Sequence, residues 1–450
     1  MDGQHDQKRL ADLGEQLISA AKAAGAEAAD AVVVQGRALS VSCRLGKVEE
    51  IDQAEGDDLG LRVMIGKRQA IVSANRPDPR EFAALAERAV AMARLAPEDP
   101  YCGLADKALL ARDWPDLDML DMAAISADEL RDLALAAEQA ALGVTGISNS
   151  NGASAGRSLG GMVLITSDGF SGSYLGSHFS VSCSPIAGSG TAMERDYDYA
   201  SVNHFADLPD AASIGRSAGE RTVRRLNPRK IASGRFPVFF EARAANSLIG
   251  HFLGAISGAA VARKTSFLRD CMNEAVFAAG ISIVEDPLRR RGLRSKPFDG
   301  EGVATQKLKL VEKGVLKSWL LDSASARELG LVSNGHASRG TGSPPSPGAS
   351  NVHLEPGIKS PDQLIKDMGR GLYVTDLIGH GVNGVTGDYS RGAAGFWVEN
   401  GEIAYPVSEI TIASNLKDMY ASMVPADDLE FRYGVNSPGV LIAEMTLAGQ

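Results

Sequence analysis

One pentapeptide of the chain has the pattern of a serine nucleophile. Residues 152–156 read Gly-Ala-Ser-Ala-Gly and match G-x-S-x-G, with Ser154 in the nucleophile position. In hydrolases this motif requires a strand before the serine and a helix after it. Here polar residues precede the motif and a glycine-rich strand candidate follows it, so a turn between two strands explains the pattern better. A hydrolase that uses Ser154 remains an alternative.

A second glycine pattern, near the C-terminus, has the spacing of a dinucleotide-binding loop. Residues 379–384 read Gly-His-Gly-Val-Asn-Gly, and residues 373–378 before them are a strand candidate. A dinucleotide site also needs a helix whose N-terminus faces the pyrophosphate. The residues that follow, 385–395, indicate loop and strand, so the pattern argues against a nucleotide cofactor.

The same loop carries more polar side chains than tight turns require. Glycines let an extended peptide approach the backbone, and polar side chains supply hydrogen-bond donors and acceptors for it. The candidate peptide-binding residues are His380, Gly381, Asn383, Thr386, Asp388, Ser390 and Arg391. In the alternative interpretation, the loop is a structural turn network in which Asp388 and Ser390 hydrogen-bond their own backbone. Both interpretations remain open.

Histidine and cysteine, the usual ligands of zinc, are scattered along the chain. The histidines include no HxH or HxxxH pair, and the cysteines include no CxxC pair. His251 falls on an apolar helix face, where a half-buried, hydrogen-bonded histidine is expected. The four cysteines predict reduced thiols, and therefore a cytoplasmic protein, instead of a disulfide framework.

Four separated segments, in a fixed order, carry a family resemblance. They are SFLRD at 266–270, LRSKPFDGEG at 293–302, GVLKSWLLDSASARELGL at 314–331, and the glycine-rich residues 379–416. With these segments the chain resembles the TldE/PmbA branch of the TldD/TldE metallopeptidase family. The resemblance extends from about residue 30 to the C-terminus.

The TldD branch of that family carries HExxxH, in which two histidines hold zinc and the glutamate activates water. The similar helix here reads NSLIGH, with Asn246 in the place of the first ligand, Ser247 in the place of the base, and only His251 retained. Asparagine is a poor zinc ligand, and serine cannot act as a carboxylate-like base near neutral pH. The family's cysteine ligand has no counterpart in FRYGVNSPG from Phe431. The resemblance thus implies a chain with no metal and no catalytic residue of its own.

The resemblance also implies a role inside a complex. A TldD-like subunit would carry the zinc and cut unfolded or extended peptides, and this chain would complete the chamber of a cytoplasmic heterodimer. Without that partner the chain could form a homodimer. Two alternatives stay open, namely a non-enzymatic protein that modulates DNA gyrase or a toxin–antitoxin pair, and the independent hydrolase based on Ser154. A TldD-like gene in the same genome would favour the heterodimer.

The composition is that of a soluble globular protein. With 450 residues, the chain is expected to fold as two or three domains. Its net charge of −10 and pI near 5.3 argue against a nucleic-acid surface. The first residues are polar and lack the apolar core of a signal peptide. The sequence contains no run of about 18 apolar residues, so no membrane span is expected. Basic clusters within 221–230 and 289–296 are expected on solvated faces.

The patterning predicts an α+β fold in three domains. We expect an N-terminal α/β domain at residues 1–95, a proline- and aspartate-rich linker at 96–120, a middle α+β domain at 121–230 and a β-rich C-terminal domain at 231–450. The family resemblance implies the PmbA/TldD type of this architecture, with the third domain metallopeptidase-like.

Helical and strand periods place the elements within these domains. One amphipathic helix has apolar residues at Leu10, Leu13, Leu17, Ile18 and Ala21. A second has Phe82, Leu85, Ala86, Ala89, Val90 and Ala93 on one face. Ser126 and Glu129 form a capping box that starts a third helix. A strand at 235–241 precedes the helix that carries His251, and Asn400-Gly401 predicts a two-residue hairpin turn. The polar loop 333–351 is expected to be mobile or to order against a partner.

Overall fold

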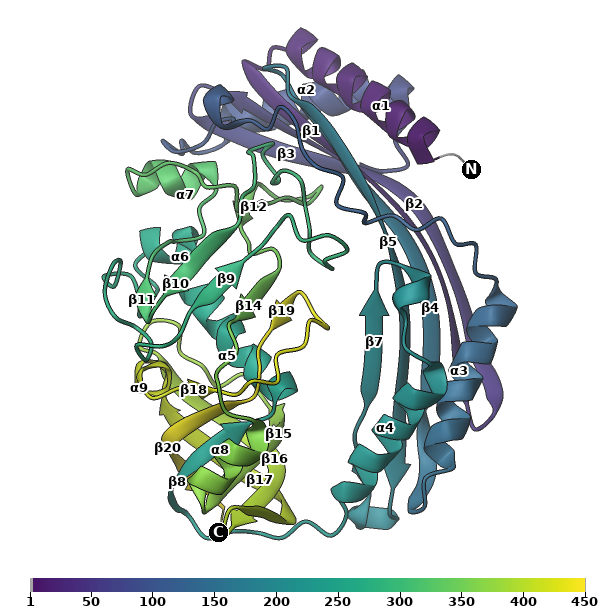
Figure 1. Cartoon of the computed structure of the whole chain (residues 1–450). Helices are drawn as coiled ribbons and strands as arrows, with labels where there is room; N and C mark the ends of the chain where they lie inside the picture. Colours follow the sequence, from purple (N-terminus) through teal and green to yellow (C-terminus); the bar gives the residue numbers. More distant parts are fainter. Residues whose placement is uncertain (1–2, 450) are drawn as a thin grey trace.

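The structure is a computed structural model that describes residues 3–449, with side chains from Gln7 onward. A long curved sheet with four helices forms one side of the molecule, and a C-terminal part forms the other (Figure 1). The α+β fold expected from the sequence is confirmed. Within residues 3–449 no helix is both long enough and apolar enough to cross a membrane.

The curved sheet has seven strands in the order β3-β2-β1-β4-β5-β6, and β7 pairs with β5 beside β6. All of its pairings are antiparallel. The strands are β1 Ala28–Arg44, β2 Lys47–Ile65, β3 Arg68–Asn75, β4 Ile147–Thr166, β5 Ser171–Ala187, β6 Glu194–Arg195 and β7 Asp198–Val202. Because β1 pairs with β4, the same sheet contains strands from the predicted N-terminal and middle regions.

One local prediction in this sheet is wrong. Residues 152–156 looked like a turn, but they lie inside β4, where residues 153–156 pair with β1 and β5. Gly152 accounts for the misreading, because it has a positive φ of 103° where the register of β4 shifts against β5.

The four helices of this side pack on one face of the sheet. They are α1 Gly3–Ala23, α2 Phe82–Leu95, α3 Ala127–Leu142 and α4 Ala211–Arg224. Alternate residues of a strand point to the same face of the sheet, and in β1 the odd-numbered residues face the helices. Ala31 and Val33 pack under α1 and α2, and Val41 and Cys43 pack under α3 and α4. The six apolar residues predicted for the second helix are the buried residues of α2, and the predicted capping box begins α3.

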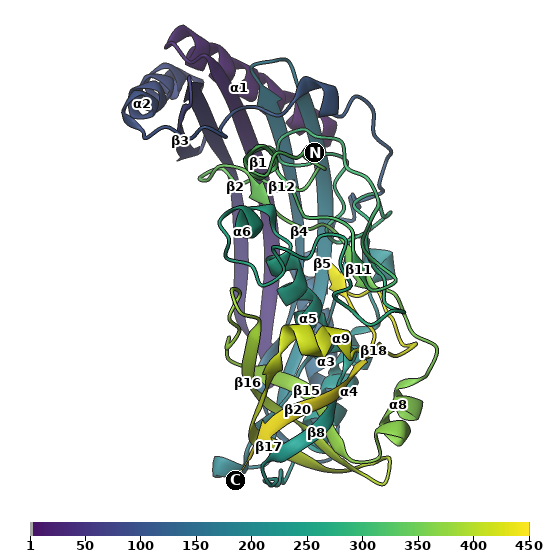
Figure 2. The ribbon, with the colours of Figure 1, turned by 90° about the vertical axis from the view of Figure 1, so that its left-hand side faces the viewer.

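The opposite face of the sheet receives the C-terminal part, which lies in front of the strands in Figure 2. Phe298 is fully buried here against Phe170 and Tyr174 of the sheet and Trp114 of the segment between α2 and α3. The loop 333–351 also packs here, against the same chain. Its Arg339 pairs with Asp30 of β1 at 2.5 Å, and neither side chain is more than 4% exposed.

The C-terminal part contains two main sheets, with strand orders β17-β16-β15-β8-β20-β18 and β11-β10-β9-β14-β19. The first comprises β8 Gly234–Phe240, β15 Gly371–Ile378, β16 Asp388–Glu399, β17 Glu402–Asn415, β18 Val424–Pro425 and β20 Val440–Ala448. The second comprises β9 Ile283–Glu285, β10 Leu308–Glu312, β11 Val315–Leu316, β14 Val352–Leu354 and β19 Val435–Asn436. A short pair is formed by β12 Ala337–Ser338 and β13 Ser346–Pro347.

The helices of this part surround its core. They are α5 Ala242–Ala255, α6 Gly258–Ala262, α7 Ser323–Glu328, α8 Pro361–Met368 and α9 Leu416–Ala421. Short 3-10 helices elsewhere are Pro79–Glu81, Lys107–Leu109, Gly190–Ala192 and Phe205–Asp207. Helix α5 is central, because Leu248 and Phe252 are fully buried and the Leu248 carbonyl accepts from the Tyr420 hydroxyl at 3.0 Å. The predicted strand 235–241, the following helix and the turn at Asn400-Gly401 are confirmed.

Candidate functional site

Helix α5 presents the three motif positions predicted from the sequence. The Ser247 hydroxyl donates to the Ala244 carbonyl at 2.7 Å, so this hydroxyl is hydrogen-bonded to the backbone of its own helix. Asn246 Oδ1 and His251 Nε2 are buried and find no hydrogen-bond partner among residues 3–449. His251 was expected to be half-buried and hydrogen-bonded. Its intermediate exposure agrees, but Nε2 has no hydrogen bond within the described chain.

Neighbours of His251 come from β16, which contains Tyr389 and Arg391, and from the loop before it, which contains His380. The His251 and Tyr389 rings are 6.0 Å apart and nearly perpendicular. Burial lowers the pKa of His251, and the nearby charges of Arg391 and His380 lower it further. The fold therefore brings two separate predictions together, because the degenerate motif on α5 lies beside the candidate peptide-binding loop.

This cluster does not fit a zinc ion. Zinc sites in proteins use three or four Cys, His or carboxylate ligands. Among residues 3–449, no three His, Cys, Asp or Glu side chains are grouped so that they could hold a metal. At α5 the neighbour of His251 that carries a fixed charge is Arg391, which would repel a cation.

Three of the predicted peptide-binding residues hydrogen-bond within their own loop. Thr386 Oγ1 donates to Asp388 Oδ2 at 2.6 Å, and Asn383 Oδ1 accepts from the Val385 amide at 2.9 Å. Asn415 Nδ2 donates to the other Asp388 oxygen at 3.2 Å. These contacts form a local network, as in the turn interpretation, but the Asp388 carboxylate accepts from the side chains of Thr386 and Asn415 and not from its own backbone.

The remaining residues of the loop are placed differently. Gly381 accepts from the Ser390 amide at 2.7 Å, and a Cβ at this glycine would lie 1.9 Å from the Ser390 carbonyl oxygen. His380 is exposed, and Arg391 makes one long hydrogen bond, at 3.4 Å to the Leu377 carbonyl. Ser390 is exposed as well, so the side chains of His380, Ser390 and Arg391 are the ones in this segment that a ligand could contact.

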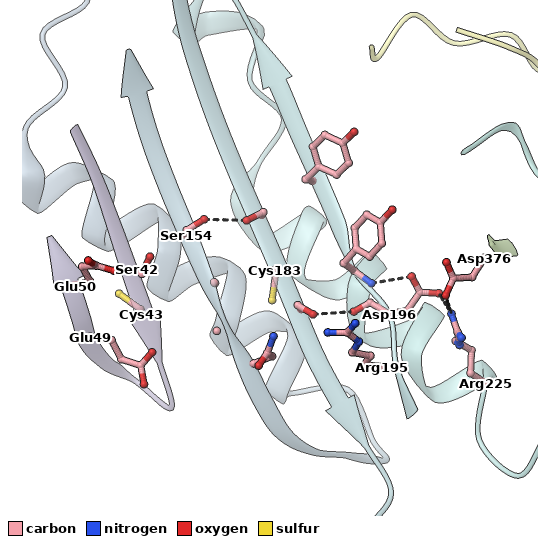
Figure 3. Close-up of a pocket in the computed structure, with 17 residues that line it drawn as sticks. Ser42, Cys43, Glu49, Glu50, Ser154, Cys183, Arg195, Asp196, Arg225 and Asp376 are labelled. Carbon is pink, nitrogen blue, oxygen red and sulfur yellow. Dashed lines mark hydrogen bonds and ion pairs between the residues drawn. The ribbon is translucent and has the colours of Figure 1, made fainter. Parts of the chain in front are cut away.

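Sequence reasoning missed a cavity of about 590 Å³ between the curved sheet and the C-terminal part (Figure 3). Ser42, Ser154 and Ser182 line it from three neighbouring strands. The Ser154 and Ser182 hydroxyls are 2.9 Å apart, and the described residues of the lining include no histidine that could activate a serine. In the sequence these serines alternate with apolar residues, which indicates that they share one face of the sheet. The sequence does not show that the C-terminal part covers that face.

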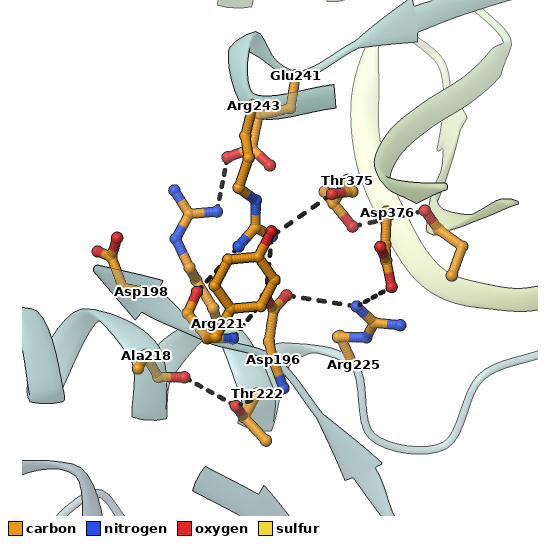
Figure 4. Close-up of polar contacts among 12 residues, drawn as sticks. Asp196, Asp198, Ala218, Arg221, Thr222, Arg225, Glu241, Arg243, Thr375 and Asp376 are labelled. Atoms are coloured by element: carbon orange, nitrogen blue, oxygen red, sulfur yellow. Dashed lines mark hydrogen bonds and ion pairs between the residues drawn. The ribbon is translucent and has the colours of Figure 1, made fainter. Parts of the chain in front are cut away.

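The wall of this cavity contains a buried carboxylate, Asp196 (Figure 4). The Asp196 side chain is 4% exposed and pairs with Arg243 at 2.9 Å and with Arg225 at 3.4 Å. Arg225 also pairs with Asp376 of β15 at 3.3 Å, and Arg221 pairs with Glu241 at 2.7 Å. These pairs connect α4 to the C-terminal part.

The expectation that the basic cluster at 221–230 forms a solvated face is therefore wrong for two of its members. The Arg225 side chain is 12% exposed and that of Arg221 is 30% exposed. Their carboxylate partners lie elsewhere in the chain, so composition around 221–230 could not reveal them. Since buried guanidinium groups require such partners, the network fixes the position of α4 against β15.

Models of one family match almost the whole chain. The PmbA/TldA metallopeptidase domain 1 matches residues 29–93, the central domain matches 121–226 and the C-terminal domain matches 233–449. The chain is 42% identical to metalloprotease PmbA of Escherichia coli O157:H7 and 41% identical to a metalloprotease PmbA homolog of Haemophilus influenzae. Each alignment covers 96% of this chain and 94% of the relative.

A solved structure has the same fold over the same length. It is that of a proposed modulator of DNA gyrase from Bacteroides thetaiotaomicron, which is similar to this chain with a TM-score of 0.90 and 26% sequence identity. The superposition covers 98% of both chains. The likeness therefore includes the curved sheet as well as the C-terminal part.

Proposed function

Because the chain belongs to the PmbA branch of the PmbA/TldD metallopeptidase family, we propose that it is the zinc-free subunit of a two-subunit peptidase. A TldD-like subunit would hold the zinc and cut extended peptides. This chain would complete the path along which the peptide is held, and would contribute no group to bond cleavage.

One observation carries the zinc-free assignment, namely the residues at the motif positions of α5. Asn246 stands where the resemblance implies a first ligand, and the Ser247 hydroxyl is bonded to its own helix. His251 is left with a neighbouring guanidinium from Arg391 instead of a second ligand. A family member with this arrangement needs its catalytic metal from another subunit.

The peptide-holding role is supported by the surface around that helix. One wall of the 590 Å³ cavity is lined by small residues of β1, β4 and β5, such as Ser42, Ser154 and Ser182, which allow close approach of a backbone. Arg391 adds a cationic group beside α5, and His380 adds an imidazole. We also place the pair in the cytoplasm, which suits the four cysteines, since all lie in the described part of the chain and are free thiols.

The purified chain should contain no stoichiometric zinc. The expected content, by elemental analysis after purification without chelators, is well below one zinc per chain, because α5 offers one imidazole and no second ligand of the usual kind. His251→Ala should leave this low content unchanged. Near-equimolar zinc that disappears in His251→Ala would contradict the proposal.

Arg391→Ala should weaken peptide binding by the assembled pair about ten-fold. A charge-assisted hydrogen bond typically contributes about 1.5–3 kcal/mol, and 1.4 kcal/mol corresponds to a factor of ten. Binding of an uncleaved extended peptide can be measured by fluorescence anisotropy, with Arg235→Ala as control because Arg235 is exposed and pairs only with Glu444 among described residues. Normal peptide affinity in an intact complex would exclude contact through Arg391. Loss of assembly would instead assign Arg391 a structural role in β16.

A further inference from the structure

A second cavity lies at the N-terminal end of helix α5, beyond the Asp196 network. Its volume is about 220 Å³, and Asn246 lines it together with Arg221 and Glu241. Figure 4 shows Glu241 and Arg221 on this side of the network, with Asp198 nearby. Sites for drug-sized ligands typically measure about 300–1,000 Å³, so this cavity suits a single chain end or a single side chain.

Two buried oxygens at this cavity have no donor. Glu241 Oε1 accepts from Arg221 at 2.7 Å, whereas Oε2 is buried and has no hydrogen-bond partner among residues 3–449. Asn246 Oδ1 is also buried and also has no hydrogen-bond partner among these residues. Buried polar atoms in folded proteins are nearly always hydrogen-bonded, so two acceptors left open at one cavity point to a donor group supplied by a ligand.

The charges around the cavity favour a cation. Every guanidinium group in the lining is already paired with a carboxylate; the pairs are Arg221–Glu241 at 2.7 Å, Arg243–Asp196 at 2.9 Å and Arg432–Asp198 at 2.9 Å. Asp428 and Glu430 also line the cavity, and neither forms an ion pair within residues 3–449. The lining therefore has negative charge that no described side chain neutralises.

We propose that this cavity binds a primary ammonium group of a peptide, with Glu241 Oε2 and Asn246 Oδ1 accepting its hydrogen bonds. An ammonium group has three N–H donors and no acceptor, which matches two open acceptors in an acidic surrounding. Only the choice of a peptide as ligand rests on the proposed function. The position of a lost zinc ligand, Asn246, thereby becomes a binding position for the substrate.

The ammonium group can belong to a peptide N-terminus or to a lysine side chain, and three probes distinguish them. They are triglycine amide with a free N-terminus, N-acetyl-triglycine amide, and N-acetyl-Gly-Lys-Gly amide. Saturation-transfer NMR titrations on the isolated full chain suit weak ligands of this size. Triglycine amide should bind at least about ten-fold more tightly than its acetylated form. If N-acetyl-Gly-Lys-Gly amide also binds, the cavity accepts lysine side chains as well as peptide N-termini. If it does not bind, the cavity is specific for N-termini.

Two variants and a matched control locate the binding. Glu241→Gln removes the charge but keeps an oxygen that can accept from Arg221, and Asn246→Leu removes the second acceptor. Each should weaken binding of triglycine amide about ten-fold. Glu402→Gln, which changes the same charge at an exposed residue outside the cavity, should leave it unchanged. If Glu241→Gln fails to fold, Glu430→Gln replaces it, because Glu430 is exposed and lines the cavity.

Equal binding of free and acetylated triglycine amide would overturn the proposal. Wild-type affinity in both Asn246→Leu and the glutamate variant would overturn it as well. These titrations use no partner subunit and no zinc. Their failure would therefore leave the two-subunit peptidase untouched, and failure of that peptidase would not affect a measured ammonium site.

Discussion

Mixed with a TldD-like subunit from the same organism, this chain should raise peptidase activity at least about 100-fold over either subunit alone. The physical reason is positioning, because a peptide must be held so that its scissile bond meets the metal-bound water. A misplacement of only about 1 Å can cost a factor of about 100 in rate. In our proposal this chain supplies part of that holding surface, including the cavity lined by Ser42 and Ser154.

The measurement is cleavage of a fluorescently labelled, unfolded peptide by each subunit and by the mixture. Size-exclusion chromatography should show a single complex, with on the order of 2,000 Å² or more buried if the pair is obligate. Zinc in the complex should be about one per pair. Full activity of the TldD-like subunit without this chain would exclude the role proposed for it.

The Phe298→Ala variant should be destabilised by about 3–5 kcal/mol, the range for removing a fully buried phenylalanine. Phe298 is 0% exposed, and its ring lies 5.0–5.5 Å from the rings of Trp114, Phe170 and Tyr174. These three residues belong to the sheet side, so the truncation removes packing between the two sides of the molecule. The loss should therefore also loosen the C-terminal part from the sheet.

Chemical denaturation and limited proteolysis check both effects. Phe431→Ala is the matched control, because Phe431 is 47% exposed and contacts the Arg289 guanidinium, 3.7 Å from its ring centroid, and the His353 ring, 5.1 Å away. A surface cation–π contact contributes only about 0.5–1 kcal/mol. If Phe298→Ala and Phe431→Ala shifted the unfolding midpoint equally, the aromatic contact would not be what holds the two sides together.

Helices with strong periodicity could be predicted residue by residue. The buried face of α2, from Phe82 to Ala93, follows from a 3.6-residue period that no neighbouring element overrides. The long strands could not be predicted in the same way. Glycines such as Gly36 and Gly152 suggest breaks, whereas both lie inside long strands. Gly36 is paired within β1, and Gly152 lies in β4 where its register shifts against β5.

The candidate site was predictable only in pieces. The positions Asn246, Ser247 and His251 follow from the motif, but the proximity of His251 to Arg391 depends on how α5 packs beside β16. The Asp196 network lay beyond sequence reasoning, because Arg225 and Asp376 are distant in the chain and nothing local signals that they pair. The cavity at Glu241 was missed for the same reason.

The pairing of β1 with β4 has a consequence for how the chain acquires its structure. In that pairing Asp30 lies opposite Thr166 and Cys43 lies opposite Ala153, so contacting residues are more than 100 positions apart. Closing so long a loop costs entropy before any contact is gained, which slows formation of the sheet. During synthesis β1 emerges long before β4, and until then β1 has one unpaired edge, a feature that favours aggregation. The N-terminal half of this protein therefore depends on completing β4, and the nascent chain should need protection until that strand arrives.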